Sequence, residues 1–345
     1  MGEQRFPHPW VKCRVMGESI RVGIAGLTHG HVWGLIEAFR KVEGVEMVAV
    51  ADATPLLDRA KDKFAKSYTS WQEMLEQETL DALVVTSNNV ESSEIAIQAL
   101  GKGIPCLVEK AMAANAADAD RMLEAMRASG KTLMINWPLA WAPWLQEVKR
   151  LLDEGAVGPV FNAHYRNGHF GPKEIGCDEW FVGWLYDETL NGGGAIADFC
   201  SYGAVLCRWL FGMPESVYCI RQNYTKDYEV PDDFASCVLR YPKMQATVEG
   251  TWAHRGDDHR ANPAFYGKDG TISVTGNFVY NSTTGREEGR TAPPLEVSSP
   301  AVYFLECIKT GRMPEGILNP EIAADACRIL DAAKKSSVSG CAEKL

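Results

Sequence analysis

Short apolar runs and amphipathic stretches alternate along the first 137 residues, and this rhythm restricts the fold more than any other feature of the sequence. Strand-like runs are predicted at residues 20–25, 46–51, 80–86, 105–109 and 132–136. Helix-like stretches are predicted between them at residues 32–42, 56–64, 71–77, 92–101 and 114–129. Strands that are joined by helical crossovers form parallel sheets. The alternation therefore predicts an α/β fold that begins with a doubly wound parallel sheet over residues 20–137.

The rhythm changes after residue 137, where strands begin to follow one another directly. Helices are predicted at 144–154 and 203–210, and strands at 160–168, 217–222, 234–241, 245–252, 264–266 and 271–275. Consecutive strands indicate a large, open and mostly antiparallel sheet. We predict an N-terminal arm over residues 1–19, a second α/β domain over 138–318 and a C-terminal helical segment over 319–345. The polar segment 285–294, which contains Gly and Pro, is expected to be a mobile loop.

Charge and hydropathy exclude several functional classes. The formal net charge of −10 over 345 residues argues against a nucleic-acid-binding surface, which is normally basic. No apolar run reaches the roughly 18 residues of a membrane span, and residues 1–19 lack the apolar stretch of a secretion signal. Ten cysteines are present without a C-x-x-C pair, mostly inside apolar segments. We expect reduced thiols in a cytoplasmic protein.

A turn with the sequence Gly26-Leu27-Thr28-His29-Gly30-His31 joins the first predicted strand to the first helix. Backbone N–H groups at such a helix start lack partners and can bind phosphate. Of the glycines in the dinucleotide pattern G-x-G-x-x-G only the first is kept, and Thr28 and His31 fill the other two positions. The turn is therefore either a dinucleotide site or a tight connection without a ligand.

Asp52 ends the second predicted strand, 22 residues after Gly30, where an acidic side chain can accept hydrogen bonds from a ribose. No arginine follows it to hold a 2′-phosphate, which favours NAD over NADP and leaves NADP open. In the competing interpretation Asp52 caps the next helix. His29 and His31 are expected to bond to the pyrophosphate or to the substrate edge. Because the loop offers them no third ligand, no metal site is predicted.

Glu109 and Lys110 end the fourth predicted strand, at the sheet edge where ligands of parallel sheets bind. A lysine there can hold a hydroxyl group and assist proton transfer, and Glu109 would keep it charged and oriented. The alternative is an exposed ion pair of little energetic value. Further along, Gly192-Gly193-Gly194 requires an unusual backbone or a ligand pressed close to it. Asp198 and Tyr202, four residues apart, would share one helix face.

The order of these pieces resembles the glucose–fructose oxidoreductase and inositol dehydrogenase (Gfo/Idh/MocA) family from residue 20 to about residue 335. The matching features are the Gly26 turn, Asp52, Thr86, Glu109-Lys110, Trp184, the glycine run, Asp198 and residues 265–271. The resemblance implies a Rossmann domain that binds NAD(P) and hydride transfer to or from a sugar or polyol carbon. It also implies a homodimer or homotetramer formed through the open sheet. The family's catalytic lysine and aspartate map to Lys110 and Asp198.

The sequence differs from that family at positions next to the expected catalytic residues. Ala111 replaces the proline of the Glu-Lys-Pro motif, so the usual cis or rigid proline turn is not expected, and Ser87 replaces a second proline after Thr86. Tyr202 stands where the family has histidine. The ordinary pKa of a phenol is about 10, against about 6.5 for histidine. We therefore expect Lys110 to assist Tyr202 as the general base, with Lys110, Asp198 and Tyr202 as catalytic residues.

The remaining candidates line the two sides of the expected crevice. Thr86 and Asn88 join the cofactor side, and Trp184, His169 and His254 the substrate side. The polar segment 254–259 contains two histidines and two aspartates, and a pocket rim or a solvated loop is expected there rather than a metal site. The leading hypothesis is an NAD(P)-dependent dehydrogenase, and the alternatives are an NAD-assisted hydrolase or lyase and a non-catalytic sensor.

Overall fold

The computed structural model describes residues 19–256 and 260–345. Its N-terminal half contains a six-stranded sheet in the order β3-β2-β1-β4-β5-β6, and every neighbouring pair is parallel. The strands are β1 (Ile20–Ala25), β2 (Val45–Ala51), β3 (Lys66–Tyr68), β4 (Ala82–Val85), β5 (Cys106–Glu109) and β6 (Leu133–Asn136). The connecting helices are α1 (Val32–Arg40), α2 (Leu57–Ala60), α3 (Trp71–Gln77), α4 (Asn89–Gly101) and α5 (Ala116–Ser129). The predicted doubly wound sheet is confirmed.

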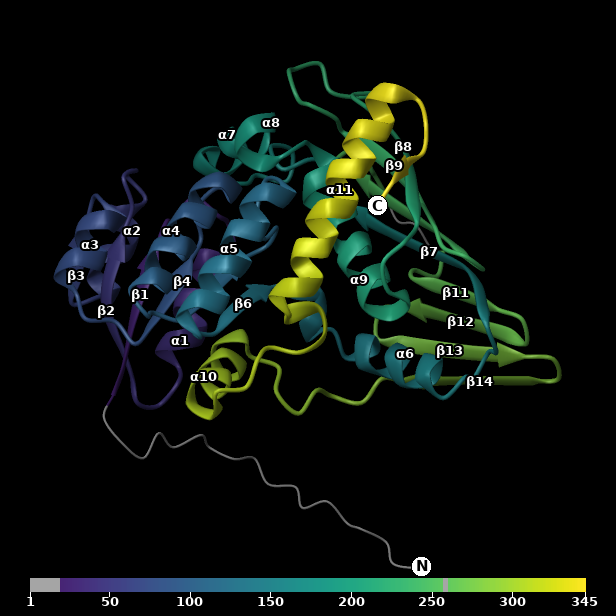
Figure 1. Cartoon of the computed structure of the whole chain (residues 1–345), viewed down its shortest axis with the longest axis horizontal. Coiled ribbons are helices and arrows are strands. Elements are labelled where there is room, and N and C mark those ends of the chain that lie inside the picture. Colours follow the sequence, from purple (N-terminus) through teal and green to yellow (C-terminus); the bar gives the residue numbers. More distant parts are fainter. Residues whose placement is uncertain (1–18, 257–259) are drawn as a thin grey trace, which may run out of the picture.

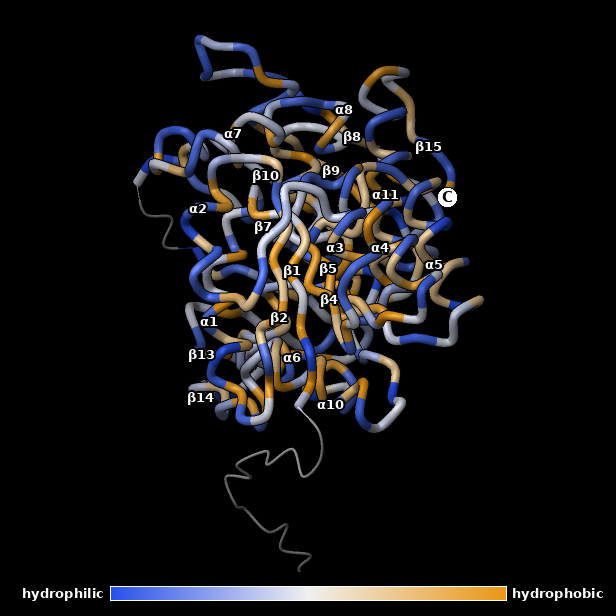
Figure 2. Tube along the Cα trace, turned by 90° about the vertical axis from the view of Figure 1, so that its left-hand side faces the viewer, coloured by the Kyte–Doolittle hydropathy of each residue, from blue (hydrophilic) through white to orange (hydrophobic). Residues whose placement is uncertain are grey.

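Both faces of this sheet are buried. Side chains of successive strand residues point to opposite faces, and those on each face belong to a different apolar cluster. On β4, Leu83 and Val85 lie in one cluster and Val84 lies in the other. The strands form the most hydrophobic part of the molecule's centre (Figure 2). Parallel strands buried in this way leave only their ends for ligands, so the carboxyl edge of the sheet is where a site is expected.

The second half is built on a nine-stranded sheet in the order β14-β13-β12-β11-β7-β10-β9-β8-β15. Its strands are β7 (Val160–Gly168), β8 (Ser216–Gln222), β9 (Phe234–Arg240), β10 (Gln245–Thr251), β11 (Ala264–Gly267), β12 (Gly270–Thr275), β13 (Phe278–Thr283), β14 (Arg286–Thr291) and β15 (Glu343–Lys344). Each neighbouring pair is antiparallel except β7 with β10. The predicted open, mostly antiparallel sheet is confirmed (Figure 1).

The prediction of a mobile loop at residues 285–294 is wrong, because β14 occupies most of that segment and pairs along its length with β13. All six residues of β14 are exposed. An edge strand without a buried face carries no apolar alternation, so its sequence resembles that of a loop. β3 was not predicted either: a short α2 and a 3₁₀ turn, η1 (Lys61–Lys63), replace the helix expected at 56–64.

The helices of the second half are α6 (Pro143–Asp153), α7 (Glu179–Leu185), α8 (Glu188–Asn191), α9 (Ser201–Phe211), α10 (Pro300–Thr310) and α11 (Pro320–Ser339). Short helical turns lie at η2 (Pro138–Trp141), η3 (Ile196–Cys200) and η4 (Gly316–Leu318), of which η3 is a π-helix. Helix α11 contacts both β8 and α5, so it lies between the two sheets (Figure 1). Helix α10 returns to the first half, where the rings of Phe304 and Phe39 lie 6.5 Å apart in one apolar cluster.

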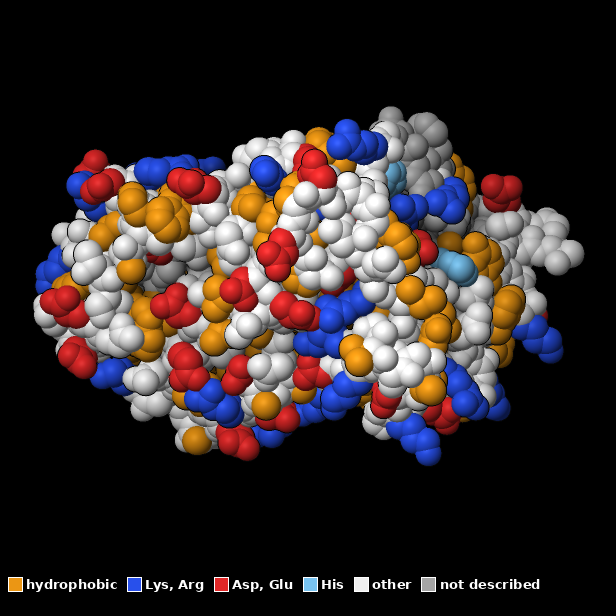
Figure 3. Space-filling view, turned by 90° about the horizontal axis from the view of Figure 1, so that it is seen from above, with side chains coloured by type: hydrophobic (Ala, Val, Ile, Leu, Met, Phe, Trp, Pro, Cys, Tyr) orange, Lys and Arg blue, Asp and Glu red, His pale blue; other side chains and the backbone are white. Residues whose placement is uncertain are grey.

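No helix within residues 19–256 and 260–345 combines the length and apolarity needed to cross a membrane. Acidic and basic side chains are interspersed on the face shown in Figure 3. The nine cysteines within the described part of the chain carry free thiols.

Candidate active site

Lys110 and Asp198, from different halves of the molecule, meet at the carboxyl edge of the first sheet. Lys110 directly follows β5, and its Nζ lies 2.5 Å from Oδ1 of Asp198, which lies on η3. Both side chains are 7% exposed. The indole Nε1 of Trp252 donates to the other carboxylate oxygen, Oδ2, at 2.9 Å. Sequence reasoning missed Trp252, although its place one residue after β10 was a usable signal.

The glycine run brings η3 close to the first half because it lets backbone approach backbone. A Cβ on Gly192 would lie 2.1 Å from the carbonyl oxygen of Ala114, and a Cβ on Gly194 would lie 2.2 Å from that of Asp232. Gly192 also has a φ of +89°. The sequence left open whether the glycine run accommodates a ligand or an unusual backbone. In the structure, Gly192 and Gly194 make room for neighbouring backbone.

Buried polar contacts hold this junction in place. Asn89, at the start of α4, donates through Nδ2 to the carbonyl and side-chain oxygens of Asn191 at 2.9 and 3.1 Å. Asp232 accepts from the backbone N–H groups of Gly194 and Ile196 at 3.1 and 2.8 Å. Two amide N–H groups on one carboxylate fix the start of η3, and with it the position of Asp198.

Charge is balanced within the buried pair. Burial opposes the charged form of Lys110, but Asp198 and Tyr202 raise the pKa of Lys110 above its ordinary value. Burial likewise opposes the carboxylate form of Asp198, and Lys110 and Trp252 lower its pKa. Both groups therefore stay ionised at neutral pH, and neither is a ready proton acceptor.

Tyr202 lies beside this pair, as its spacing from Asp198 predicted. Lys110 Nζ is 4.9 Å from the centroid of its ring, and the ring of Trp137 packs edge-on at 5.4 Å. Burial raises the pKa of Tyr202 to about 12, with Lys110 acting in the opposite direction. The lysine is present as expected, but burial outweighs it, so the phenol keeps its proton at neutral pH. The peptide bond between Lys110 and Ala111 is cis, which the missing proline did not lead us to expect.

The 26–31 turn is held by its neighbours on the sheet edge. Gly26 has a φ of +83°, and a Cβ there would lie 2.7 Å from the backbone nitrogen of Ser87. The Thr86 hydroxyl donates to the carbonyl of Gly26 at 2.5 Å. Asp52 accepts from the N–H groups of Leu27 and Thr54 at 2.6 and 2.7 Å. Close backbone contact explains why the first glycine of the pattern is the one that the sequence keeps.

The same turn fits a dinucleotide. The hydroxyl of Thr28 is buried and has no hydrogen-bond partner among the described residues, so it offers a contact to a bound group. Helix α1 starts directly after His31 without a side-chain cap, and the N–H groups of Val32 and Gly34 donate to the carbonyls of His29 and His31 at 3.0 and 3.1 Å. A pyrophosphate held there would place the rest of the cofactor along the edge that carries Lys110.

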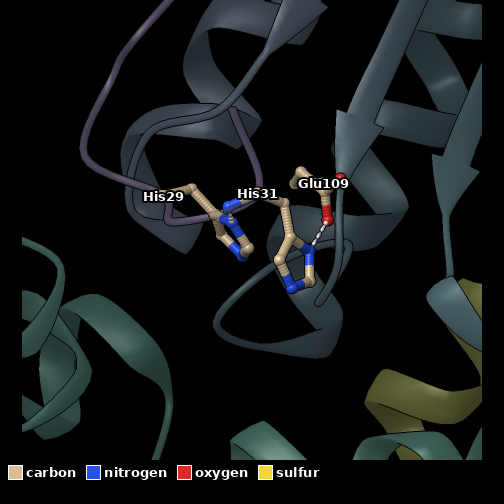
Figure 4. A group of neighbouring side chains, drawn as sticks. All are labelled: His29, His31 and Glu109. Atoms are coloured by element: carbon tan, nitrogen blue, oxygen red, sulfur yellow. Dashed lines mark hydrogen bonds and ion pairs between the residues drawn. The ribbon is translucent and has the colours of Figure 1, made fainter. Parts of the chain in front are cut away.

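His29, His31 and Glu109 form a cluster between this turn and β5 (Figure 4). Their ligand-type atoms all lie within 4.8 Å of one another. However, both ring nitrogens of His29 are engaged, since Nδ1 accepts from the N–H of His31 and Nε2 lies 3.2 Å from the carbonyl oxygen of Lys110. Nδ1 of His31 lies 2.9 Å from Oε2 of Glu109. The geometry is that of a hydrogen-bonded group, and the part played by Glu109 toward His31 was not predicted.

The other predicted residues take varied positions. Asn88 caps α4, since its side chain accepts from the N–H of Glu91. Trp184 is buried, and its Nε1 donates to the carbonyl of Thr28 at 3.3 Å, so it contacts the cofactor turn. His169 packs edge-on against Phe199 at 5.0 Å, and burial lowers its pKa.

His254 lies next to His169, because its backbone N–H donates to the carbonyl of His169 at 3.2 Å. The polar segment that follows was expected to be a pocket rim or a solvated loop. Its residues Asp257, Asp258 and His259 lie outside the described residues.

Comparison with known proteins agrees with this architecture. The description "Oxidoreductase family, NAD-binding Rossmann fold" matches residues 20–137, and "GFO/IDH/MocA C-terminal domain" matches residues 145–273. Inositol 2-dehydrogenase of Salmonella typhimurium is 28% identical over 154 residues, which are 43% of this chain and 46% of that protein. The chain thus spans about half the length of the curated relatives that it matches first.

Solved structures extend the likeness in fold to nearly the whole chain. Aldose-aldose oxidoreductase from Caulobacter crescentus superposes with a TM-score of 0.79 at 21% identity, covering 95% of this chain and all of that one. Levoglucosan dehydrogenase, in complex with NADH and levoglucosan, gives a TM-score of 0.80 at 17% identity and covers 95% of this chain and 99% of its own. With its two halves matching both domains in order, the chain belongs to the GFO/IDH/MocA family of oxidoreductases, whose Rossmann fold binds NAD.

Proposed function

We propose that this protein is an NAD(P)-dependent dehydrogenase that acts on a hydroxyl-bearing carbon of a sugar or polyol. The observation that carries the proposal is the buried contact of Lys110 with Asp198 at 2.5 Å, on the same sheet edge as the 26–31 turn. A charged pair that is buried at the ligand-binding edge of a Rossmann sheet stabilises the fold little by itself, and it is suited to bind a polar substrate.

Two groups of residues at the carboxyl edge of the first sheet have separate roles, one toward the cofactor and one toward the substrate. The 26–31 turn and Asp52 would hold the dinucleotide, which when bound supplies the hydride acceptor or donor. Lys110 donates to a substrate hydroxyl, and Asp198 accepts from it. Since Tyr202 keeps its proton at neutral pH, it donates that proton to the substrate oxygen during reduction. During oxidation only the small ionised fraction of Tyr202, which the Lys110 ammonium stabilises, can accept the substrate proton, so oxidation is favoured at high pH.

Charge balance around the pair favours an uncharged substrate. Lys110 is neutralised by Asp198, and the nearby Lys226 lies 2.6 Å from Glu174. A substrate carboxylate would need a cation that is not already paired, whereas hydroxyl groups can bond to both members of an existing pair. The names of inositol 2-dehydrogenase and levoglucosan dehydrogenase agree with a polyhydroxy substrate.

The open face of the second sheet supports assembly of several copies. Paired residues in register place Tyr218 and Tyr280 in one row that crosses this sheet, and both are exposed. Ile220 and Tyr266 are exposed on strands β8 and β11 of the same sheet. Exposed aromatic side chains on a sheet face mark association surfaces. We therefore assign residues 138–318 to substrate binding and to formation of a homodimer or homotetramer. The free thiols in the described part of the chain support a cytoplasmic location.

Titration of the purified protein with NADH and with NADPH, followed by fluorescence, tests cofactor binding and preference. A screen of sugars and polyols with NAD and NADP, followed by reduced-nicotinamide absorbance, then tests turnover. Binding with net reduction of the cofactor supports the dehydrogenase. Tightly held cofactor with product but no net redox change would indicate the NAD-assisted hydrolase or lyase. Binding without any reaction would indicate a sensor.

A further inference from the structure

His169 directly follows β7 and lies close to the buried pair of Lys110 and Asp198. Its ring packs edge-on against the ring of Phe199, with 5.0 Å between the two centroids. The Nζ atom of Lys110 lies 6.0 Å from the centroid of the same phenyl ring, and the ring of Tyr202 lies 6.2 Å from it. The three polar groups therefore lie around one side chain, so His169 belongs to the same site as the proposed catalytic residues.

The backbone of the next loop sets the tautomer of the His169 ring. Nδ1 of His169 accepts from the backbone N–H of Gly171 at 3.0 Å. A ring nitrogen that accepts a hydrogen bond carries no proton, so in the neutral ring the proton is on Nε2. Nε2 bonds to none of the residues that the structure describes, and His169 is half-buried. His169 therefore has one N–H group that can donate to a ligand.

A buried cation holds the loop that contains Gly171. The side chain of Lys226 is 5% exposed, and its Nζ donates to the carbonyl of Phe170 at 2.5 Å and to Oε1 of Glu174 at 2.6 Å. The position of the Gly171 N–H is therefore fixed by its neighbours in the loop. Because that N–H bonds to Nδ1, the ring of His169 is held in one orientation.

His169 is neutral near pH 7. Burial lowers its pKa, and the charges of Asp198 and Lys110 act on it in opposite directions. Protonation would also remove the lone pair of Nδ1 that accepts from the loop. In this tautomer Nε2 has no lone pair to accept a proton, so the ring is a fixed hydrogen-bond donor and not a general base.

We propose that His169 determines substrate specificity by donating from Nε2 to a second substrate oxygen, separate from the oxygen that exchanges a proton with Tyr202. A site that is built to form such a bond discriminates against a compound without the oxygen, because the partly buried N–H then loses its partner. The substrate class is therefore a compound with at least two oxygens, such as a sugar or polyol, and not a monohydric alcohol. This inference rests on the proposed function.

Two substitutions separate this role from one in holding the loop. The amide of His169→Asn can accept the Gly171 N–H as Nδ1 does, but it is too short to reach the position of Nε2. The longer His169→Gln places an N–H near that position and gives up the loop bond. With the sugar or polyol that gives the highest kcat/KM in the substrate screen, His169→Asn should lower kcat/KM at least ~10-fold, and His169→Gln should stay within ~3-fold of wild type. If His169→Asn were as active as His169→Gln or more active, the proposal would be overturned.

Monodeoxy derivatives of the same compound identify the oxygen. With wild type, one derivative should lose at least ~10-fold in kcat/KM, whereas His169→Asn should use that derivative and the parent compound equally well, within ~2-fold. If every derivative lost the same factor with both proteins, His169 would contact no substrate oxygen.

Fluorescence titration with NADH separates the substrate side from the cofactor side. Both variants should bind NADH as wild type does, and a loss of NADH affinity that matched the loss of kcat/KM would overturn the assignment. His164→Gln changes an exposed histidine on β7 and should match wild type in every assay. If no sugar or polyol in the screen reacts with wild type, it is the proposed function that fails.

Discussion

Lys110 and Asp198 lie 88 positions apart in the sequence, yet Nζ of Lys110 lies 2.5 Å from Oδ1 of Asp198. One residue comes from the end of a parallel strand and the other from a π-helix in the second half. The contact therefore joins the two halves of the molecule. It also lies where the reaction is proposed to occur.

Removing one member of this pair should destabilise the fold, and removing both should not restore activity. Lys110→Met leaves Asp198 buried without a cation, which should lower the free energy of unfolding by about 3–5 kcal/mol. The double variant Lys110→Met with Asp198→Asn should regain at least half of that loss. Turnover should stay at least ~10²-fold below wild type in both variants. Urea unfolding and kcat measurements separate the two effects, and an active double variant would refute the proposed roles.

Trp252→Phe should loosen Asp198 while leaving most of the packing in place. The change removes the N–H that donates to Oδ2 at 2.9 Å, which should cost about 1.5–3 kcal/mol because the acceptor is charged. Turnover should fall about 10-fold. Trp137→Phe is the matched control for stability, since Trp137 is equally buried and its Nε1 has no partner among the described residues. Equal losses of stability in the two variants would show that the hydrogen bond contributes nothing.

Tyr202→Phe should reduce kcat at least ~10²-fold, because the variant cannot exchange a proton with the substrate oxygen. Because the pKa is about 12, the rate of reduction in wild type should show no loss from phenol ionisation below about pH 11, whereas the rate of oxidation should rise with pH over the same range. Tyr241→Phe is the control, as it removes another buried phenol hydroxyl that has no partner in the described part of the chain. Near-normal turnover of Tyr202→Phe would remove this residue from the mechanism.

His29 should make the fold sensitive to mild acid. Burial lowers its pKa from 6.5 to about 3, so between these values the unfolded chain binds a proton that the folded chain does not. The free energy of unfolding should therefore decrease as the pH falls from about 6.5 toward 3, and this residue should account for about 3 kcal/mol of the loss at pH 4. His29→Gln should show a correspondingly flatter dependence between about pH 7 and about pH 4 in urea titrations. An unchanged slope would mean that His29 is protonated in the folded state.

Gly192→Ala and Gly311→Ala separate backbone conformation from close packing. Both residues adopt the left-handed conformation, with φ of +89° and +68°, but a Cβ on Gly192 would meet the Ala114 carbonyl whereas Gly311 has open space around it. Gly311→Ala should cost about 1–2 kcal/mol. Gly192→Ala should cost about 3–5 kcal/mol and also lower kcat, because it pushes η3 away from Lys110. Similar thermal stabilities of the two variants would show that the junction can relax.

Much of the fold could be predicted because burial leaves a clear pattern in the sequence. β1, β4 and β5 are buried on both faces, and their apolar runs agree with the observed strands to within a few residues. β14 could not be found in this way, since its pairing depends on backbone groups and its side chains all face solvent. Pattern analysis detects which side chains are buried, and an exposed edge strand has none.

The site was predicted in part, and the omissions share one physical cause. Lys110, Asp198 and Tyr202 were named, and the structure brings them together. The contact of Glu109 with His31 joins residues 78 positions apart, and that of Trp252 with Asp198 joins residues 54 apart. Each depends on side-chain directions that only the packed structure defines. The glycine run was recognised as unusual, but a sequence does not distinguish a ligand from a neighbouring backbone as the reason.

The first sheet leaves the ribosome long before α10 does, because synthesis proceeds from the N-terminus. Until Phe304 packs against Phe39, the apolar cluster that contains residues of β1 and α1 lacks the side chains that α10 contributes. The first half therefore cannot complete its core before α10 has been synthesised, and its contacts with Phe304 form only after that helix leaves the ribosome.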